Sequence, residues 1–123
     1  MPQRNLVSVV DDDESVRESL PDLLTSHGFV TRAFASAEAF LDSEVLAATA
    51  CLVLDVSMPG MTGPELQIEL AKRQIDVAIV FITAHADVTV EAQVLKRGAQ
   101  AFLLKPFTEA AIVEAVAAAL GKG

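Results

Sequence analysis

Five polar side chains stand at or just after the ends of short apolar runs in this sequence: Asp11, Asp12, Asp55, Thr83 and Lys105. Crowded carboxylates repel one another, and a hard divalent cation such as Mg²⁺ relieves that repulsion while keeping waters and a phosphate oxygen among its ligands. A lysine ammonium binds a phosphoryl oxygen as a point charge, and a hydroxyl donates a hydrogen bond to another. If the fold gathers these groups, they suit phosphoryl transfer with Asp55 as nucleophile, because it is the one acid alone on its apolar run.

The apolar runs predict strands that are buried on both faces. A short continuous run bounded by turn residues is typical of a strand in a parallel sheet covered by helices. The predicted strands are Asn5 to Val10, Phe29 to Phe34, Cys51 to Leu54, Val77 to Ile82 and Ala101 to Leu104. Because ligands of open parallel sheets bind beyond the carboxyl ends of the strands, we expect the five polar side chains to share one edge.

Helical spacing of apolar residues follows each strand, which predicts helices on both faces of the sheet. The first helix covers residues 16–27 and ends at Gly28. Pro21 lies inside it and predicts either a kink or a later start. The third helix is expected to have Pro64 in its first turn. Its predicted inward residues are Leu66, Ile68 and Leu70.

Composition limits the class of protein. A chain of 123 residues with 52% hydrophobic residues is long enough for one domain with a sizeable core. The formal net charge of −8 makes this domain alone a poor binder of nucleic acid. Its single cysteine, Cys51, cannot form an intramolecular disulfide, and no apolar run approaches membrane-spanning length. We therefore expect a cytoplasmic protein with no membrane partner.

Four motifs in order, VVDDDES, LDVSMPGMTG, FITAH and AFLLKPF, resemble the receiver domain of bacterial two-component response regulators. The similarity covers the whole chain and is strongest to FixJ-like regulators, in which a receiver precedes a LuxR/NarL-type helix-turn-helix output domain that controls transcription. The resemblance implies a flavodoxin-like α/β fold with strand order 2-1-3-4-5, five helices and three layers. It also implies that residues 1–123 are one receiver domain and that this chain holds no output domain.

The resemblance assigns roles to the polar residues. It implies that Asp55 accepts a phosphoryl group from a sensor histidine kinase. Mg²⁺ or Mn²⁺ would be held by three carboxylates and one backbone carbonyl: those of Asp11, Asp12 and Asp55, and that of Ser57. Lys105 would bind the phosphate. A receiver is a phosphoacceptor signalling domain, and it catalyses only its own phosphorylation and dephosphorylation.

Further residues are implied to transmit or tune the signal. The hydroxyl of Thr83 would move toward the phosphoryl group, and the ring of Phe102 would turn inward behind it. This would alter the surface of the fourth helix, fifth strand and fifth helix, residues 87–120, and the resemblance implies a homodimer through that surface on phosphorylation. Ser57 and His85 are candidates for tuning hydrolysis of the phosphoryl group.

Two other functions fit parts of the pattern. The spacing Asp11-x-Asp13-x-Ser15 resembles the nucleophile loop of haloacid-dehalogenase-type phosphatases, in which Asp11 would be the nucleophile and Asp13 the acid/base. The chain is also compatible with an interaction module whose site is never phosphorylated. Simpler structural interpretations remain for single residues: the acids from Asp11 onward suit a helix N-terminus, and Phe102 suits a core.

Overall fold

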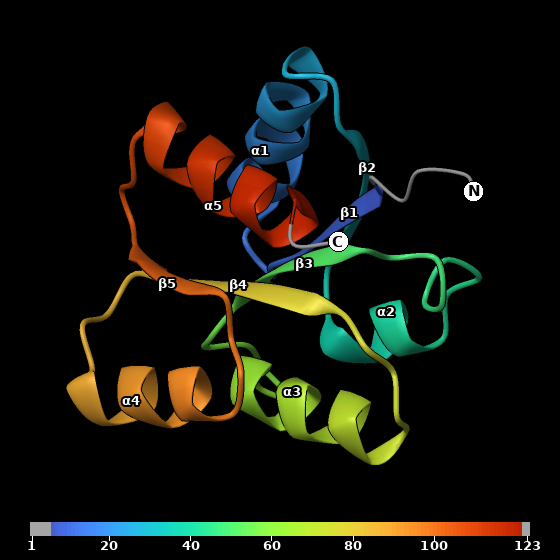
Figure 1. Cartoon of the computed structure of the whole chain (residues 1–123), viewed down its shortest axis with the longest axis vertical. Coiled ribbons are helices and arrows are strands. Elements are labelled where there is room, and N and C mark those ends of the chain that lie inside the picture. Colours follow the sequence, from blue (N-terminus) through green and yellow to red (C-terminus); the bar gives the residue numbers. More distant parts are fainter. Residues whose placement is uncertain (1–5, 122–123) are drawn as a thin grey trace.

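A parallel five-stranded sheet forms the middle layer of the protein (Figure 1). The computed structural model describes residues 6–121, so Asn5, which the sequence analysis places in the first strand, lies outside the described residues. The strands are β1 (Leu6–Val10), β2 (Val30–Phe34), β3 (Cys51–Asp55), β4 (Ala78–Thr83) and β5 (Ala101–Leu104). Their order is β2-β1-β3-β4-β5, and every neighbouring pair is parallel, as predicted.

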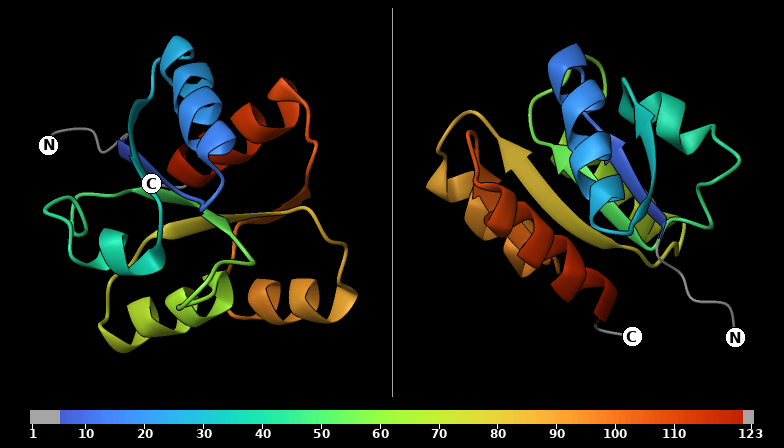
Figure 2. Two further views of the ribbon diagram at one scale, coloured as in Figure 1. Left: turned by 180° about the vertical axis from the view of Figure 1, so that it is seen from behind. Right: turned by 90° about the horizontal axis from the view of Figure 1, so that it is seen from above.

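Helices cover both faces of the sheet and complete three layers (Figures 1 and 2). The helices α1 (Glu14–Ser26) and α5 (Glu109–Gly121) pack on one face. The other face carries α2 (Ala37–Leu41), α3 (Gly63–Lys72) and α4 (Val88–Lys96). The predicted fold class and helix number are therefore confirmed.

Alternating side chains of the central strands feed two separate cores. Val53 of β3 faces the core with α1 and α5, whereas Leu52 and Leu54 face the core with α2, α3 and α4. All five residues of β3 are buried, including Asp55 at its carboxyl end. Because β3 is packed from both sides, its carboxyl end is held firmly in the sheet.

Asp13 fixes the beginning of α1, and Pro21 does not interrupt it. The Asp13 carboxylate accepts a hydrogen bond from the Ser15 N–H at 2.9 Å, so the helix begins at Glu14. The alternative of a helix that starts later than predicted is therefore wrong. Burial of Leu20 and Leu24 on either side of the proline holds both neighbouring turns against the sheet.

Some predicted boundaries and facings differ from the structure. The C-cap of α1 is His27, and Gly28 follows in the left-handed region with φ +92°. β2 and β4 each begin one residue later than predicted, and Asp55 and Thr83 are themselves the last residues of their strands.

The inward face of α3 is the clearest error of the sequence analysis. Leu66 and Leu70 are buried, but Ile68 is 42% exposed. A residue two positions along a helix of 3.6 residues per turn points to the opposite side, so Ile68 cannot share a face with Leu66. Thr62 caps the helix through a capping box with Glu65, and Pro64 lies in its first turn as predicted.

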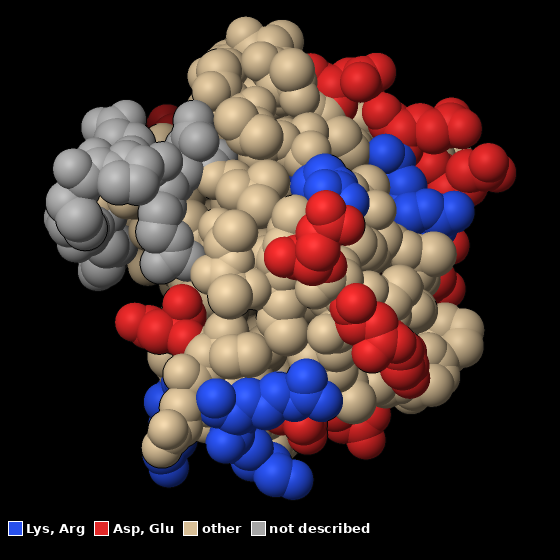
Figure 3. All heavy atoms as spheres, turned by 90° about the vertical axis from the view of Figure 1, so that its right-hand side faces the viewer, with Lys and Arg blue, Asp and Glu red and all other residues tan. Residues whose placement is uncertain are grey.

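The side of the molecule that carries β2 and α2 has unevenly distributed charge (Figure 3). Acidic side chains gather along one edge in this view, and basic side chains gather at the bottom. The two basic residues at the end of α3, Lys72 and Arg73, both pair with Glu69, at 3.9 and 2.8 Å. Among the described residues, no helix is long and apolar enough to cross a membrane.

Replacing Gly63 with alanine is expected to destabilise the protein by roughly 1–3 kcal/mol. A Cβ at Gly63 would lie 2.3 Å from the Asp55 carbonyl oxygen, so either α3 or the end of β3 would have to shift. Urea unfolding followed by circular dichroism measures the change. The matched control is Gly121→Ala, because a Cβ there meets nothing within 4 Å. Equal stability of the two variants would show that this close approach does not constrain the fold.

Candidate functional site

Three carboxylates meet at the carboxyl edge of the sheet. Asp55 ends β3, and Asp11 and Asp12 follow β1, which is its direct neighbour with Val10 in register with Leu54. One carboxylate oxygen from each of the three acids lies within 4.8 Å of the others. Asp11 is fully buried and Asp55 is 5% exposed, whereas Asp12 is exposed. The sheet therefore crowds two buried acids and leaves the third at the surface.

Lys105 enters this cluster from the end of β5. Its Nζ lies 2.8 Å from Asp11 Oδ2 and 3.7 Å from Asp55 Oδ1. Its backbone N–H donates to the Thr83 carbonyl at 2.7 Å, which extends the sheet pairing by one residue and aims the side chain along the edge. Partial burial alone would lower the Lys105 pKa, but the hydrogen bond and charge of Asp11, with the charges of Asp55 and Asp13, raise it. The side chain is therefore a cation held among carboxylates.

Asp11 is fixed through both carboxylate oxygens. Oδ2 accepts from Lys105, and Oδ1 accepts from the Asp13 backbone N–H at 2.9 Å. The carbonyl of Asp11 also accepts a hydrogen bond at 3.0 Å from Nη1 of Arg17, a residue that the sequence analysis did not consider. Asp13 itself caps α1 through its side chain, which is the simpler of the two roles suggested for it.

The pKa of Asp55 is raised from its usual 3.8 to about 6. Burial is the main cause, and the charges of Asp11 and Asp12 add to it. Lys105 and a hydrogen bond from the Ser57 backbone lower the pKa but do not outweigh the other effects. The site is thus short of positive charge even with Lys105 present.

The donor set fits a hard cation. It consists of carboxylate oxygens from Asp11, Asp12 and Asp55, and the described residues add no histidine or cysteine to the cluster. Oxygen-only sites with few carboxylates suit Mg²⁺ or Mn²⁺ rather than zinc. Ser57 follows Asp55 closely enough for its backbone N–H to reach the Asp55 carboxylate, so its carbonyl belongs to the same turn of chain.

Thr83 lies at the end of β4, with its hydroxyl engaged by its own loop. Its Oγ1 accepts from the His85 N–H at 3.1 Å and donates to the His85 carbonyl at 3.4 Å. Thr83 is 2% exposed, whereas His85 is exposed. The side chain therefore lies at the predicted edge, but it interacts with the β4–α4 connection (residues 84–87).

Phe102 is half-buried against the core beneath α4. It pairs in register with Phe81 of β4, and its ring packs on the same cluster as Leu54 and Val94. In this structure it acts as a core residue, and its part in a switch remains a prediction.

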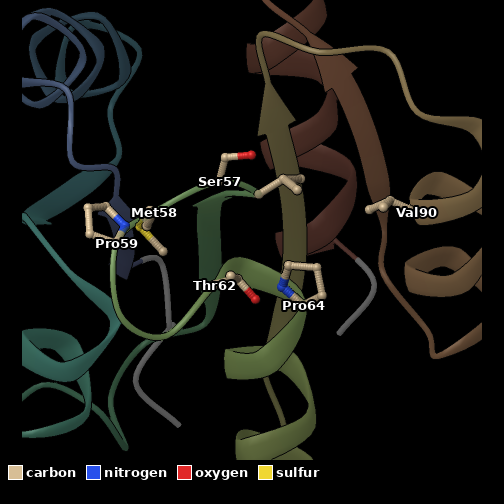
Figure 4. Close-up of a pocket in the computed structure, with 7 residues that line it drawn as sticks. Ser57, Met58, Pro59, Thr62, Pro64 and Val90 are labelled. Carbon is tan, nitrogen blue, oxygen red and sulfur yellow. The ribbon is translucent and has the colours of Figure 1, made fainter.

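A groove of about 540 Å³ lies between the connection from β3 to α3 and the start of α4, and its lining begins at Val56, the residue after Asp55 (Figure 4). Ser57, Met58 and Pro59 line it from the connection, and Val90 faces them from α4. The constraint at Gly63 was not predicted from the sequence: its close approach to the Asp55 carbonyl excludes a side chain. A T-x-x-E capping pattern at Thr62 was the signal that could have located this helix start.

The chain is similar to known proteins in both sequence and fold. The profile of the response regulator receiver domain matches residues 7–117. The transcriptional regulatory protein FixJ of Azorhizobium caulinodans is 47% identical over 122 residues, covering 99% of this chain and 58% of that protein. Nodulation protein W of Bradyrhizobium diazoefficiens is 45% identical over 114 residues, covering 93% of this chain and 50% of that protein.

A solved structure described as FixJ-N superposes with a TM-score of 0.86 at 38% identity, covering 98% of this chain and 96% of that one. The chain thus spans between half and three-fifths of the two longer relatives.

Replacing Asp55 with asparagine is expected to stabilise the metal-free protein at neutral pH. The folded protein holds the Asp55 pKa at about 6 against the usual 3.8, so the stability linked to this group is complete below pH 3.8 and is lost as the pH rises through about 6. Asparagine stays neutral throughout. The gain should be small below about pH 4 and reach roughly 1–3 kcal/mol above about pH 7, since one pKa unit is about 1.4 kcal/mol.

Urea unfolding in EDTA at several pH values measures this gain. Asp22→Asn is the control, because Asp22 is exposed on α1. A gain for Asp55→Asn that does not change between pH 4 and pH 7 would contradict the charge conflict described above.

Proposed function

Since this chain belongs to the response regulator receiver domain family, we propose that Asp55 accepts a phosphoryl group from a sensor histidine kinase. The observation that carries the proposal is the position of Asp55, 5% exposed at the end of a buried strand with the Lys105 ammonium 3.7 Å from its Oδ1. A carboxylate oxygen of Asp55 would attack phosphorus while the bond from phosphorus to the kinase histidine breaks and the electron pair leaves with the imidazole. With a pKa of about 6, Asp55 is mostly ionised at neutral pH and able to attack.

The cluster would hold Mg²⁺ or Mn²⁺, because it offers only oxygen ligands and has an excess of negative charge. The ligands would be the carboxylates of Asp11, Asp12 and Asp55 and the carbonyl of Ser57. When bound, the cation supplies charge neutralisation for the phosphoryl oxygens. Lys105 is paired with Asp11 here, and its flexible stem allows the ammonium to turn toward a phosphoryl oxygen on Asp55. Autophosphorylation from small phosphodonors would use the same groups.

Signal output would begin at Thr83. To reach the phosphoryl group, its hydroxyl must give up the hydrogen bonds with the His85 backbone, which frees the β4–α4 connection. Phe102 would then fill the space that Thr83 leaves. Ser57 and His85, both exposed beside the site, would tune the rate at which water removes the phosphoryl group.

The surface of α4, β5 and α5 would change as a result. Val94 is the one buried residue of α4, whereas Val88 is 79% exposed and Leu95 is 40% exposed. This light packing suits an element whose position shifts between two populated states. We propose that the shifted surface forms a homodimer and that residues 1–123 act as one receiver domain. Control of transcription is proposed by analogy with the regulatory proteins named above.

Incubation with acetyl phosphate and Mg²⁺ should add one hydroxylamine-labile phosphoryl group to the wild-type protein and none to Asp55→Asn. The expected result follows because asparagine cannot form an acyl phosphate. Intact-protein mass spectrometry, before and after hydroxylamine treatment, measures the label. Labelling of Asp55→Asn at the wild-type level would reject Asp55 as the site, and its loss in Asp11→Asn alone would favour the phosphatase alternative with Asp11 as nucleophile.

Lys105→Ala is expected to separate labelling from switching. Protein labelled at Asp55 in this variant should lack the amide chemical-shift changes in residues 87–120 that labelled wild type shows, because no ammonium draws the phosphoryl group toward β5. Two-dimensional NMR measures the shifts. Lys72→Ala is the control, since Lys72 is 71% exposed on α3, away from the cluster. Wild-type shift changes in labelled Lys105→Ala would show that Lys105 does not couple the phosphate to the switch.

A further inference from the structure

The connection from β3 to α3, residues 56–62 and here called the β3–α3 loop, is held at both ends. At its start the Val56 N–H donates to the Ile82 carbonyl at 3.0 Å, and the Ser57 N–H bonds the Asp55 carboxylate. At its end the Gly63 N–H donates to the Val56 carbonyl at 3.0 Å, which closes the loop on itself. The capping box between Thr62 and Glu65 fixes the same end to α3. None of these contacts involves residues 58–61, the middle of the loop.

The middle of the loop is held by a side chain from α2. Oε2 of Glu38 accepts a hydrogen bond from the Met61 N–H at 3.0 Å. Within the described part of the chain, this is the hydrogen bond that ties the backbone of residues 58–61 to another element. Glu38 is therefore well suited to set the position of the loop.

Glu38 lies close against the β3–α3 loop, and the helix that carries it is well packed. A Cβ at Gly60 would lie 2.8 Å from Glu38 Oε2, so the glycine, with φ +73°, gives the carboxylate room against the backbone. The helix α2 is capped by Ser36, and its Ala37 and Phe40 are fully buried against the sheet. The carboxylate thus reaches the loop from an element that is itself firmly packed.

We propose that Glu38 is a positioning residue for cation binding at the carboxylate cluster. It touches neither the cation nor the phosphoryl group. By holding Met61, it restricts the movement of the backbone that follows Asp55. This restriction keeps the Ser57 carbonyl beside the carboxylates. This inference rests on the proposed function, in which that carbonyl is a cation ligand.

Its main test is Mg²⁺ titration of metal-free protein, followed by NMR of the amides around Asp55. Glu38→Ala should bind Mg²⁺ about three- to tenfold more weakly than wild type, the effect expected for one lost hydrogen bond. Glu38→Gln should stay within about twofold of wild type, because the amide oxygen can accept the same hydrogen bond while the charge is removed. Labelling by acetyl phosphate should return to the wild-type rate when Mg²⁺ is raised to saturate Glu38→Ala.

Hydrogen exchange gives a second readout that needs no metal. In metal-free protein, the Met61 amide should exchange at least severalfold faster in Glu38→Ala than in wild type or Glu38→Gln, because only the alanine variant lacks an acceptor for it. The control for loss of charge is Glu44→Gln, since Glu44 is exposed in the chain that follows α2. This control should leave both the Mg²⁺ affinity and the Met61 exchange rate unchanged.

Three outcomes overturn the inference, and they can be told apart from failure of the proposed function. Wild-type Mg²⁺ affinity in Glu38→Ala would show that the contact does not position a ligand. Equal weakening in Glu38→Ala and Glu38→Gln would assign the effect to charge and not to the hydrogen bond. Unchanged exchange of Met61 in Glu38→Ala would show that Glu38 does not hold the loop. By contrast, failure of wild-type protein to bind Mg²⁺ or to be labelled would reject the proposed function itself.

Discussion

Two carboxylates that the sheet forces together define the chemistry of this protein. Asp11 directly follows β1 and Asp55 is the last residue of β3, and these neighbouring strands are paired in register up to Val10 and Leu54, so the sheet places the two residues side by side. Both are buried, and burial raises the pKa of Asp55 by opposing its ionised form. Lys105 relieves part of the conflict by bonding Asp11, yet the pKa of Asp55 stays raised at about 6. The fold therefore maintains a site that additional positive charge would stabilise.

The unfavourable placement of the Asp55 carboxylate is tolerated because hydrophobic packing in the rest of the molecule offsets its free energy. β3 is buried along its whole length between two hydrophobic cores, and Asp55 is only its last residue. Hydrophobic burial of this kind is the dominant favourable term in folding, whereas a single charge conflict is worth a few kcal/mol. A firmly packed strand can thus end in an unfavourably placed carboxylate, and the same packing keeps that carboxylate in position for chemistry.

The strands and the residues at their ends could be predicted because their signals are local. A run such as VAIVFI predicts a buried strand without reference to any other part of the chain. Parallel topology then places Thr83 and Lys105 at one edge of the sheet. Ile68 was misplaced because an alternating pattern was applied to a helix. Gly63, Arg17 and Glu38 were missed for a different reason, since each matters through a contact with a backbone atom of Asp55, Asp11 or Met61. The capping pattern at Thr62 marks the helix start at Gly63, but nothing in the residues themselves marks the contacts of Arg17 and Glu38 before the chain is folded.

The site also divides into a fixed part and an adjustable part. The sheet fixes the backbone of Asp11 and Asp55, and hydrogen bonds to both carboxylate oxygens of Asp11 hold its side chain. Thr83 and the backbone at Ser57 lie where loops begin, and a few hydrogen bonds to neighbouring groups hold those loops. Breaking one such hydrogen bond costs about 1 kcal/mol of free energy. A local change of charge can supply that much, so it can shift a loop between two positions. The acidic pair fixed by the sheet thus lies between loops that a few hydrogen bonds hold in place.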